Sequence, residues 1–298
     1  MSGIVVVGSL NVDLTVEVGR LPAPGETVIG TGSSIGLGGK GANQAAAAAA
    51  FGGTVAMVGR VGDDDGGHDL IGDLRERGVD AEGVTVTEDA RTGSATIAVD
   101  GGGENLIIVD PGANSAVTVD DVRVDRVREA DAVLVQLEIP IEAVSAAAAH
   151  TRGLFLLNPA PARELPAELL ERVDVLVPNQ AELALLAGAE PPDTLEATKE
   201  LVTGLPGEGR VVVTLGAEGA LVYEPGDDGG FTHVKAPEVE PVDTTGAGDC
   251  FCGALTVELT RGASLVDATR LAVAAAALST TAAGARGRLP ARDEAARA

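Results

Sequence analysis

The chain has 298 residues, of which 45% are apolar and only 2% aromatic, so we expect a globular protein whose core is built from Ala, Val, Leu and Ile. The formal net charge of −24, from 45 acidic and 21 basic residues, argues against nucleic-acid binding, because a phosphate backbone requires a basic surface. No apolar run approaches the roughly 20 residues of a membrane span, and no secretory signal opens the chain. We therefore expect a cytoplasmic protein with no membrane partner.

The acidic residues are scattered along the chain rather than gathered in one tail, and lysine occurs only at Lys40, Lys199 and Lys235. The simplest interpretation is a solvated acidic surface. Scattered acid with so little lysine is also typical of halophilic proteins. We hypothesise that this chain needs strong salt to screen its self-repulsion.

The first predicted strand is the apolar run at residues 4–7, which fits a strand buried on both faces of a sheet. The polar segment Gly8-Ser9-Leu10-Asn11-Val12-Asp13 follows at its carboxyl end, where parallel α/β sheets bind ligands. In extended chain Asn11 and Asp13 point to one side, which suits recognition of neighbouring hydroxyl groups. An Asx turn is the alternative for these residues.

Residues 12–18 alternate between apolar and polar and predict a half-exposed strand. The block Gly38-Gly39-Lys40-Gly41-Ala42-Asn43-Gln44 then opens onto a predicted helix at residues 45–50. It is not a Walker loop, because Ser34 stands where that loop needs its first glycine and Gly41 replaces its Ser or Thr. We expect close backbone approach to a small ligand here, with Asn43 as a donor and acceptor at the start of the helix.

The next segments predict a small second sheet. We expect a strand at residues 55–61, a helix at 69–78 that ends in glycine, and a hairpin whose strands, 94–99 and 105–109, flank a triple-glycine loop. Together with residues 12–18 and the segment after Pro24, this hairpin predicts a lid that is built from about residues 12–36 and 93–110.

From Val119 onward, predicted strands alternate with helices. Each strand ends in polar residues or glycine, as a shared ligand cleft requires. The fold class is therefore predicted as α/β, with one three-layer domain over residues 1–298 and a mostly parallel central sheet. The predicted elements are strands at 132–138, 154–158, 173–177 and 211–216, helices at 141–150 and 265–281, the latter as the final helix, and a hairpin at 221–234.

The block Asp243-Thr244-Thr245-Gly246-Ala247-Gly248-Asp249-Cys250-Phe251 follows an extended, proline-containing run at residues 236–241. It predicts a strand, a glycine turn and the first turn of a helix. Free N–H groups at a helix N-terminus attract anions. An acid inside such a site, here Asp249, is unusual as structure and sensible as a catalytic base. The flanking Cys250 and Cys252 are interpreted as small, buried packing residues.

The two glycine blocks, residues 38–45 and 243–251, together resemble carbohydrate kinases of the PfkB (ribokinase) family. The match runs from Gly8 to about Gly284 and includes Gln136-Leu137-Glu138, Asn158-Pro159-Ala160-Pro161 and Thr214-Leu215-Gly216. The resemblance implies transfer of the ATP γ-phosphoryl group to the primary hydroxyl group of a pentose, giving ribose 5-phosphate. It implies a ribokinase-like fold with a β-sheet lid.

The resemblance also implies roles for individual residues. Asp249 is the general base, and the N–H groups of Gly246, Ala247 and Gly248 form the anion hole. The sugar is bound by Asn11, Asp13, Gly38, Gly39, Lys40, Asn43, Glu138 and Asp249. The nucleotide is bound by Asn179, Glu182, Thr214, Gly216, Gly219 and Gly248.

Two metal sites follow from the same resemblance. Asn179 and Glu182 match the family's Asn-x-x-Glu motif, which is associated with Mg²⁺ and the phosphates, although a helix cap with a first-turn acid is the alternative. A K⁺ site is implied at Asp243, Thr245, Ser279, Ala282 and Gly284. The sequence departs from the family at Gly284-Ala285-Arg286-Gly287-Arg288, where a Ser is usual, and at Val273, where a polar adenine contact is usual.

The family pairs its lid strands across a homodimer, and unpaired lid edges are exposed, so a homodimer is predicted. Three alternatives remain for the function. In the first, the protein is a kinase of the same family whose acceptor is deoxyribose, a ketose or a nucleoside instead of ribose. In the second, it is a sugar sensor without catalytic activity. A dinucleotide-binding oxidoreductase is the weakest of the three, since no Gly-x-Gly-x-x-Gly opens the first helix.

Overall fold

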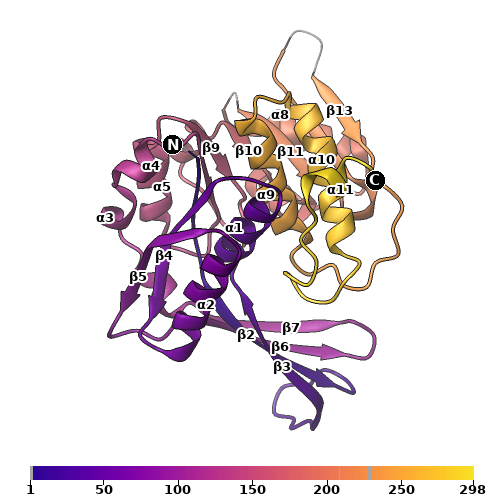
Figure 1. Ribbon diagram of the computed structural model, residues 1–298. Coiled ribbons are helices and arrows are strands. Elements are labelled where there is room, and N and C mark those ends of the chain that lie inside the picture. Colours follow the sequence, from indigo (N-terminus) through magenta and orange to yellow (C-terminus); the bar gives the residue numbers. More distant parts are fainter. Residues whose placement is uncertain (1–2, 208, 227–229) are drawn as a thin grey trace.

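The computed structural model describes residues 3–207, 209–226 and 230–298, and these form two sheets with helices packed around the larger one (Figure 1). In the described residues the larger sheet has nine strands in the order β13-β12-β11-β10-β9-β8-β1-β4-β5. Its pairs are parallel except for the antiparallel β11-β12-β13. The strands are β1 Ile4–Val7, β4 Val55–Gly62, β5 Asp80–Thr87, β8 Ala132–Val135, β9 Leu154–Leu157, β10 Val175–Leu176, β11 Arg210–Thr214, β12 Ala220–Tyr223 and β13 Phe231–Val234.

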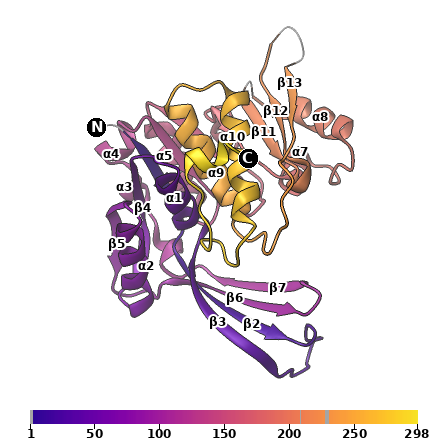
Figure 2. The ribbon, with the colours of Figure 1, turned by 45° about the vertical axis from the view of Figure 1, so that its right-hand side comes forward.

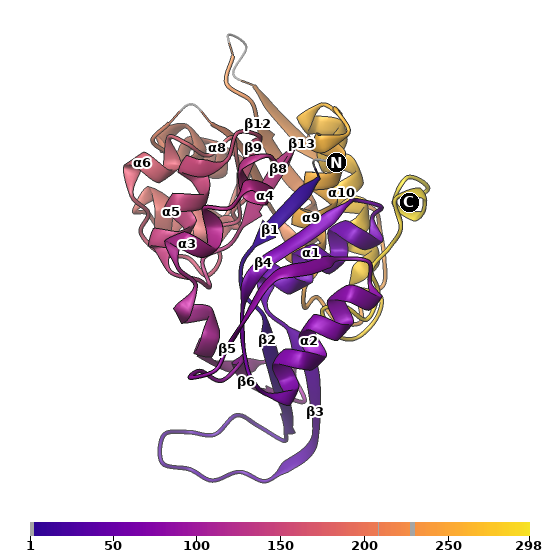
Figure 3. The ribbon, with the colours of Figure 1, turned by 60° about the vertical axis from the view of Figure 1, so that its left-hand side comes forward.

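Helices cover both faces of this sheet (Figure 3), so the predicted three-layer α/β fold is confirmed. One layer contains α1 Lys40–Ala50, α2 Asp65–Glu76, α9 Ala247–Thr260, α10 Leu265–Ser279 and α11 Arg292–Ala295. The other contains α3 Val119–Val122, α4 Asp125–Arg128, α5 Ile141–His150, α6 Ala167–Leu170, α7 Gln180–Ala187 and α8 Leu195–Gly204. Two 3₁₀ turns, η1 Gly112–Ala116 and η2 Gly216–Glu218, lie between these elements.

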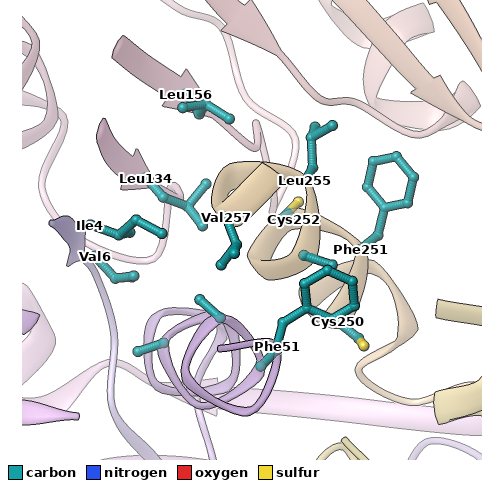
Figure 4. Close-up of a cluster of buried hydrophobic side chains, with 14 of the residues drawn as sticks. Ile4, Val6, Phe51, Leu134, Leu156, Cys250, Phe251, Cys252, Leu255 and Val257 are labelled. Atoms are coloured by element: carbon teal, nitrogen blue, oxygen red, sulfur yellow. The ribbon is translucent and has the colours of Figure 1, made fainter. Parts of the chain in front are cut away.

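The strand alternation divides the core between the two layers. In β1, Ile4 and Val6 pack into the α1/α9 layer, whereas Val5 and Val7 pack into the α5 layer, as expected because successive side chains of a strand point to opposite faces. Figure 4 shows the first of these cores, with α9 lying beside the strand residues Ile4, Val6, Leu134 and Leu156. Cys250 and Cys252 are free and buried there, which confirms their interpretation as packing residues.

The second sheet projects from the main body (Figures 1 and 2). Its four strands in the described residues run in the order β3-β2-β6-β7, namely β2 Asn11–Val18, β3 Gly30–Gly38, β6 Gly93–Asp100 and β7 Asn105–Asp110. The predicted hairpin and its neighbours are therefore found as expected. Because Asn11 and Asp13 lie within the extended strand β2, the alternative of an Asx turn is wrong.

Cross-strand pairing gives the second sheet two unlike faces. Leu14 pairs with Ile35 on β3 and lies level with Thr96 on β6, which pairs with Ile108 on β7. Paired residues share a face, so these four side chains form one row, in which Ile35 is 75% and Ile108 62% exposed. Asp13, one position before Leu14, belongs to the opposite face.

Several predicted boundaries are wrong. No strand precedes the glycine turn before α9, since residues 235–246 form no ladder and Pro237 and Pro241 have no N–H group to donate. Strands β8 and β10 are shorter than predicted, and helix α10 ends at Ser279 and is followed by α11. The half-exposed edge strand β5 was not predicted at all. Of the predicted hairpin at 221–234, residues 227–229 lie outside the described residues.

Within the part of the chain that the structure describes, no helix has the length and apolar character required to cross a membrane.

Candidate active site

Two adjoining cavities lie at the carboxyl ends of the parallel strands, and Thr214 and Gly248 line both. The smaller cavity, of about 130 Å³, is lined by residues from β10, β11, α1, α7 and α9 and from the turns that follow or precede them. Predicted site residues on its wall are Lys40, Asn179, Glu182, Thr214, Gly246, Gly248 and Asp249. Segments that are more than 200 residues apart in the sequence thus meet here, as the α/β topology requires.

Asp249 lies in the first turn of α9 and is only 8% exposed. Its Oδ2 accepts a hydrogen bond from Asn43 Nδ2 at 3.0 Å, and its Oδ1 accepts one from Gln44 Nε2 at 3.0 Å. Burial raises the pKa of Asp249, while Lys40 and the two amides oppose the rise. The carboxylate is therefore fixed in orientation and has a raised proton affinity, both of which a general base requires.

The N-terminus of α9 forms the candidate anion hole. Gly246 has φ +75°, and a Cβ at this position would lie 2.7 Å from Ala285 Cα, so only glycine fits. The N–H group of Ala247 donates to the Thr244 carbonyl oxygen at 3.2 Å. Among the described residues no hydrogen bond engages the N–H groups of Gly246 and Gly248. Two of the three predicted donors are thus free for an anion at the positive end of a 14-residue helix.

Three amides that were not assigned a role from the sequence support Asp249, of which Gln44 and Gln136 are fully buried and Asn158 is partly buried. Gln44 Oε1 accepts a hydrogen bond from Gln136 Nε2 at 2.5 Å, and Gln44 Nε2 lies 3.1 Å from Asn158 Oδ1. Asn158 Nδ2 in turn donates to the Val177 carbonyl oxygen at 2.9 Å. All three amides lie within the motifs quoted for the family resemblance. Their position in those motifs is the signal by which the sequence could have identified them.

The predicted sugar residues lie on the other side of Asp249. Asn11 pairs with Gly38 across β2 and β3, and a Cβ at Gly38 would lie 1.9 Å from Asp13 Oδ2, so the Asp13 carboxylate lies directly over Gly38. Asn11 Oδ1 accepts a hydrogen bond from Asn114 Nδ2 at 2.7 Å. Asn114 is fully buried and was not predicted. Asn11 and Asp13 are thereby held beside the Gly38 to Asn43 loop.

Glu138 joins this region to α1. Its Oε2 accepts hydrogen bonds from Ser9 Oγ at 2.5 Å and from the Lys40 N–H group at 3.1 Å. The second bond satisfies a first-turn donor of α1, whose N-cap residue Gly39 has no side chain to do so. Glu138 is therefore placed by the helix start, with its other carboxylate oxygen available to a ligand.

The acids around the site are close enough to affect one another's pKa values. Burial and the neighbouring Glu138 raise the pKa of Asp13 to about 6, with Arg286 opposing the rise. Burial disfavours the charged form of Lys40, but Asp249, Glu138 and Glu182 outweigh it and raise the pKa of this lysine. Lys40 is therefore a permanent cation among the carboxylates.

Asn179 and Glu182 fulfil the predicted helix cap. Asn179 Oδ1 accepts from the Glu182 N–H group at 2.8 Å, and Glu182 Oε2 accepts from the Asn179 N–H group at 2.8 Å, which is a capping box at the start of α7. Both residues also line the smaller cavity. The cap engages one carboxylate oxygen of Glu182, so it does not exclude a role for this residue towards phosphates.

The larger cavity, of about 600 Å³, adjoins the smaller one. Thr214, Gly216, Gly219 and Gly248 line it, as predicted, and Val273 forms part of its wall. The remaining lining is mostly apolar and comes from the 236–241 segment, α9 and α10. A largely apolar cavity of this size can accommodate a purine ring.

Three of the five predicted cation residues, Asp243, Thr245 and Gly284, meet just before the N-terminus of α9, whereas no hydrogen bond in the described residues joins Ser279 or Ala282 to them. The Asp243 carboxylate accepts hydrogen bonds from the N–H groups of Thr245 at 2.9 Å and Gly284 at 2.8 Å. Burial works against its charge, but these bonds lower the pKa of Asp243. Ser279 Oγ donates to the Ala276 carbonyl oxygen, and the Gly284 carbonyl oxygen accepts from Gly287 at 3.0 Å. The anionic Asp243 carboxylate is compatible in charge with a monovalent cation.

The side chains available to a divalent ion differ from those at the candidate K⁺ site. Across the described ranges, no group of three or more His, Cys, Asp or Glu side chains is arranged to hold a metal. Mg²⁺ commonly binds through one or two carboxylates together with substrate phosphates, and Glu182 on the cavity wall fits that mode.

Comparison with known proteins agrees with this geometry. A model of the "pfkB family carbohydrate kinase" matches residues 1–292. A ribokinase of Haemophilus influenzae is 38% identical over 97% of this chain and 95% of its own length. A deoxyribokinase of Salmonella typhi is 35% identical over 96% of this chain and 95% of its own length. The structure of Arabidopsis thaliana ribokinase complexed with ribose and ATP superimposes with a TM-score of 0.89 at 34% identity, covering 100% of this chain and 98% of that one. The chain therefore belongs to the pfkB family of carbohydrate kinases.

Proposed function

We propose that this protein transfers the γ-phosphoryl group of ATP to the 5-hydroxyl group of D-ribose, giving D-ribose 5-phosphate. The observation that carries the proposal is the position of Asp249, which is bonded to Asn43 on the sugar side and lies at the wall of the cavity that adjoins the nucleotide slot. The ribokinase relatives, one of them solved with ribose and ATP, support ribose as the acceptor.

In this mechanism Asn11, Asp13, Asn43 and Glu138 hold the sugar hydroxyl groups and leave the primary hydroxyl group facing Asp249. Asp249 takes the proton as the new O–P bond forms, and the bond between the γ-phosphorus and the β–γ bridging oxygen breaks to release ADP. The transition state of such transfers is loose, so positioning and charge stabilisation do most of the work. The α9 N-terminus and Lys40 supply positive charge on the side where the phosphoryl group passes.

The proposal includes two metal ions. Asn179 and Glu182 would hold Mg²⁺ together with the phosphates, where it neutralises charge on the transferring group. Asp243, Thr245, Ser279, Ala282 and Gly284 would hold K⁺, which adds positive charge beside the anion hole. The anionic Asp243 carboxylate supports the second site.

We further propose that the second sheet is a lid that belongs to the same domain and pairs two copies of the chain as a homodimer. The face that carries Asn11 and Asp13 would cover the sugar, and the opposite row of Leu14, Ile35 and Ile108 would meet the partner copy. Exposed apolar patches of this kind commonly mark protein interfaces.

The proposal is tested by an ATP-coupled assay with ribose, deoxyribose, ketoses and nucleosides in molar KCl, with ³¹P NMR of the product to locate the new phosphate. Ribose is expected to give the highest kcat/KM and a 5-phosphate. Preference for deoxyribose, the substrate class named for the Salmonella typhi relative, would replace ribose within the same mechanism. Ribose binding without phosphorylation of any acceptor would favour a sugar sensor.

A further inference from the structure

Arg286 lies in the segment that follows the candidate cation loop, and its guanidinium group reaches into the core of the molecule. Its side chain is only 6% exposed. Nε donates to Asn43 Oδ1 at 2.8 Å, Nη1 to Asp73 Oδ2 at 2.6 Å and Nη2 to the Gly38 carbonyl oxygen at 3.1 Å. A single side chain near the C-terminus thus contacts three elements, α1, α2 and β3, that lie more than 200 residues earlier.

Asp73 anchors this guanidinium group in a buried environment. Burial lowers the pKa of Arg286 and the pairing with Asp73 opposes that effect, as expected for a buried cation that needs a partner. The other oxygen of Asp73 accepts from Arg77 Nε at 2.8 Å. Arg77, the C-cap residue of α2, therefore shares the same carboxylate, and within the described residues no hydrogen bond joins its side chain to the proposed sugar residues.

The contact with Asn43 fixes which way its amide faces. A guanidinium group only donates hydrogen bonds and a carboxylate only accepts them. Arg286 therefore requires the Asn43 oxygen on its side, and Asp249 requires the Asn43 nitrogen on the other, at 3.0 Å. With both ends held, one N–H bond and one lone pair of this amide stay in a defined direction for a ligand.

The hydrogen bond from Arg286 to the Gly38 carbonyl oxygen concerns the part of the sugar wall formed by Asn11 and Asp13. Gly38 is the last residue of β3 and pairs with Asn11, and the Asp13 carboxylate lies over it. Arg286 also opposes the rise in the pKa of Asp13, so its charge favours the ionised form of that acid. Arg286 thus contacts Asn43 directly and acts on Asp13 through its charge, and it also bonds to Gly38, the strand partner of Asn11.

We propose that Arg286 is a positioning residue of the sugar site, because its three hydrogen bonds hold Asn43 and the Gly38 end of β3 in the geometry that the sugar requires. The inference rests on the proposed function insofar as a sugar occupies this wall. The segment Gly284 to Arg288 is where the sequence departs from the usual family ending. Lysine cannot replace the planar guanidinium group of Arg286, since an ammonium group does not reach three acceptors in fixed directions.

The test compares Arg286→Gln with Arg77→Gln, which removes the other partner of Asp73 but no contact with the sugar wall. Arg286→Gln is expected to raise the sugar KM about 10–100-fold, as loss of charge-assisted hydrogen bonds does, with a smaller change in kcat and with the KM for ATP within about twofold. Arg77→Gln is expected to leave the sugar KM within about twofold. An unchanged sugar KM in a folded Arg286→Gln variant, or an equal rise in both variants, would overturn the proposal.

Further measurements keep the test decisive. If Arg286→Gln fails to fold, Asp73→Asn weakens the anchor and is expected to raise the sugar KM less, about 3–10-fold; no rise in folded Asp73→Asn contradicts the proposal. Calorimetric titration with ribose, without ATP, separates this inference from the proposed function. Weaker ribose binding by Arg286→Gln supports the positioning role even if no sugar is phosphorylated. If another sugar is the substrate, its KM is the readout.

Discussion

Asp249 is fixed by the side-chain amides of Asn43 and Gln44, which are neutral groups. Hydrogen bonds from neutral donors orient a carboxylate without the strong stabilisation of its charged form that an arginine gives. This is the environment of a carboxylate that accepts a proton during a reaction rather than one that holds the fold together.

We predict that Asp249→Asn lowers kcat by about 10²–10⁴, the usual contribution of a general base, because an amide cannot accept the hydroxyl proton. Ribose affinity, measured by calorimetry, is expected to change by only about threefold, since the isosteric amide keeps the shape of the site. Asp267→Asn, at an exposed position of α10, is the matched control and should retain full activity. A kcat near the wild-type value in Asp249→Asn would refute the base assignment.

The pH dependence of sugar binding follows from Asp13. Its pKa is raised to about 6 by burial and by Glu138, against the opposing charge of Arg286. The carboxylate form accepts two hydroxyl groups and the protonated form does not, so binding is half-maximal near pH 6, nearly complete by about pH 7 and lost as the pH falls below 6. We predict about tenfold weaker ribose binding at pH 5 than at pH 7. Calorimetry that shows equal affinity at both pH values would contradict this role.

At the scale of the elements, the second sheet has one face that carries Asn11 and Asp13 and an opposite face with an exposed apolar row. The row of Leu14, Ile35 and Ile108 lies on the face opposite Asp13. Since the strands also leave exposed edges, an uncovered sheet of this kind is prone to association. Burial of this row against a second copy would cover the exposed apolar side chains and make the exposed sheet less prone to non-specific association.

We predict that Ile108→Glu converts a dimer into a monomer, because a carboxylate buried in an apolar interface is strongly unfavourable. Light scattering with chromatography measures the mass directly. Ile29→Glu introduces the same change at an isoleucine that is 89% exposed outside the two sheets, and it should leave the mass unchanged. A wild-type protein that is monomeric at micromolar concentration would exclude the dimer.

The elements differed in how well they could be predicted from the sequence. Strand β1 and helix α5 were predicted with their observed bounds, because an uninterrupted apolar run and an alanine-rich run have few competing structures. In the edge strand β5 the buried Ala81 and Val84 lie three residues apart, next to a register shift in the pairing with β4, so the two-residue alternation that predicts a half-buried strand is broken. The run before α9 looked extended and is extended, but its prolines prevent the pairing that would make it a strand.

At the scale of the whole molecule, the sequence motifs predicted which segments meet but not the side chains that connect them. The cavity residues around Asp249 were identifiable because their glycines and acids recur in fixed blocks. Asn114 and Arg286 stand outside those blocks, and their contacts join residues 103 and 243 positions apart. Such contacts depend on the packed fold, which local pattern does not specify.

The net charge of −24 leads to the last prediction, which separates general screening from a specific cation. Screening of surface repulsion depends on ionic strength and not on the identity of the monovalent ion. We therefore predict that the melting temperature rises from low salt to molar salt by the same amount in NaCl and KCl. Full stability at low ionic strength would refute the salt requirement.

Activity should distinguish the two salts where stability does not. The Asp243 loop carries an anionic carboxylate, and the proposed K⁺ site would favour a particular ionic radius. We predict a higher kcat in molar KCl than in molar NaCl at equal melting temperature. Asp243→Asn, which removes the charge, should abolish the difference between the salts and lower kcat in KCl. Equal kcat in both salts for the wild-type protein would argue against a potassium site, and a lower melting temperature in NaCl would show that the ion acts on folding instead.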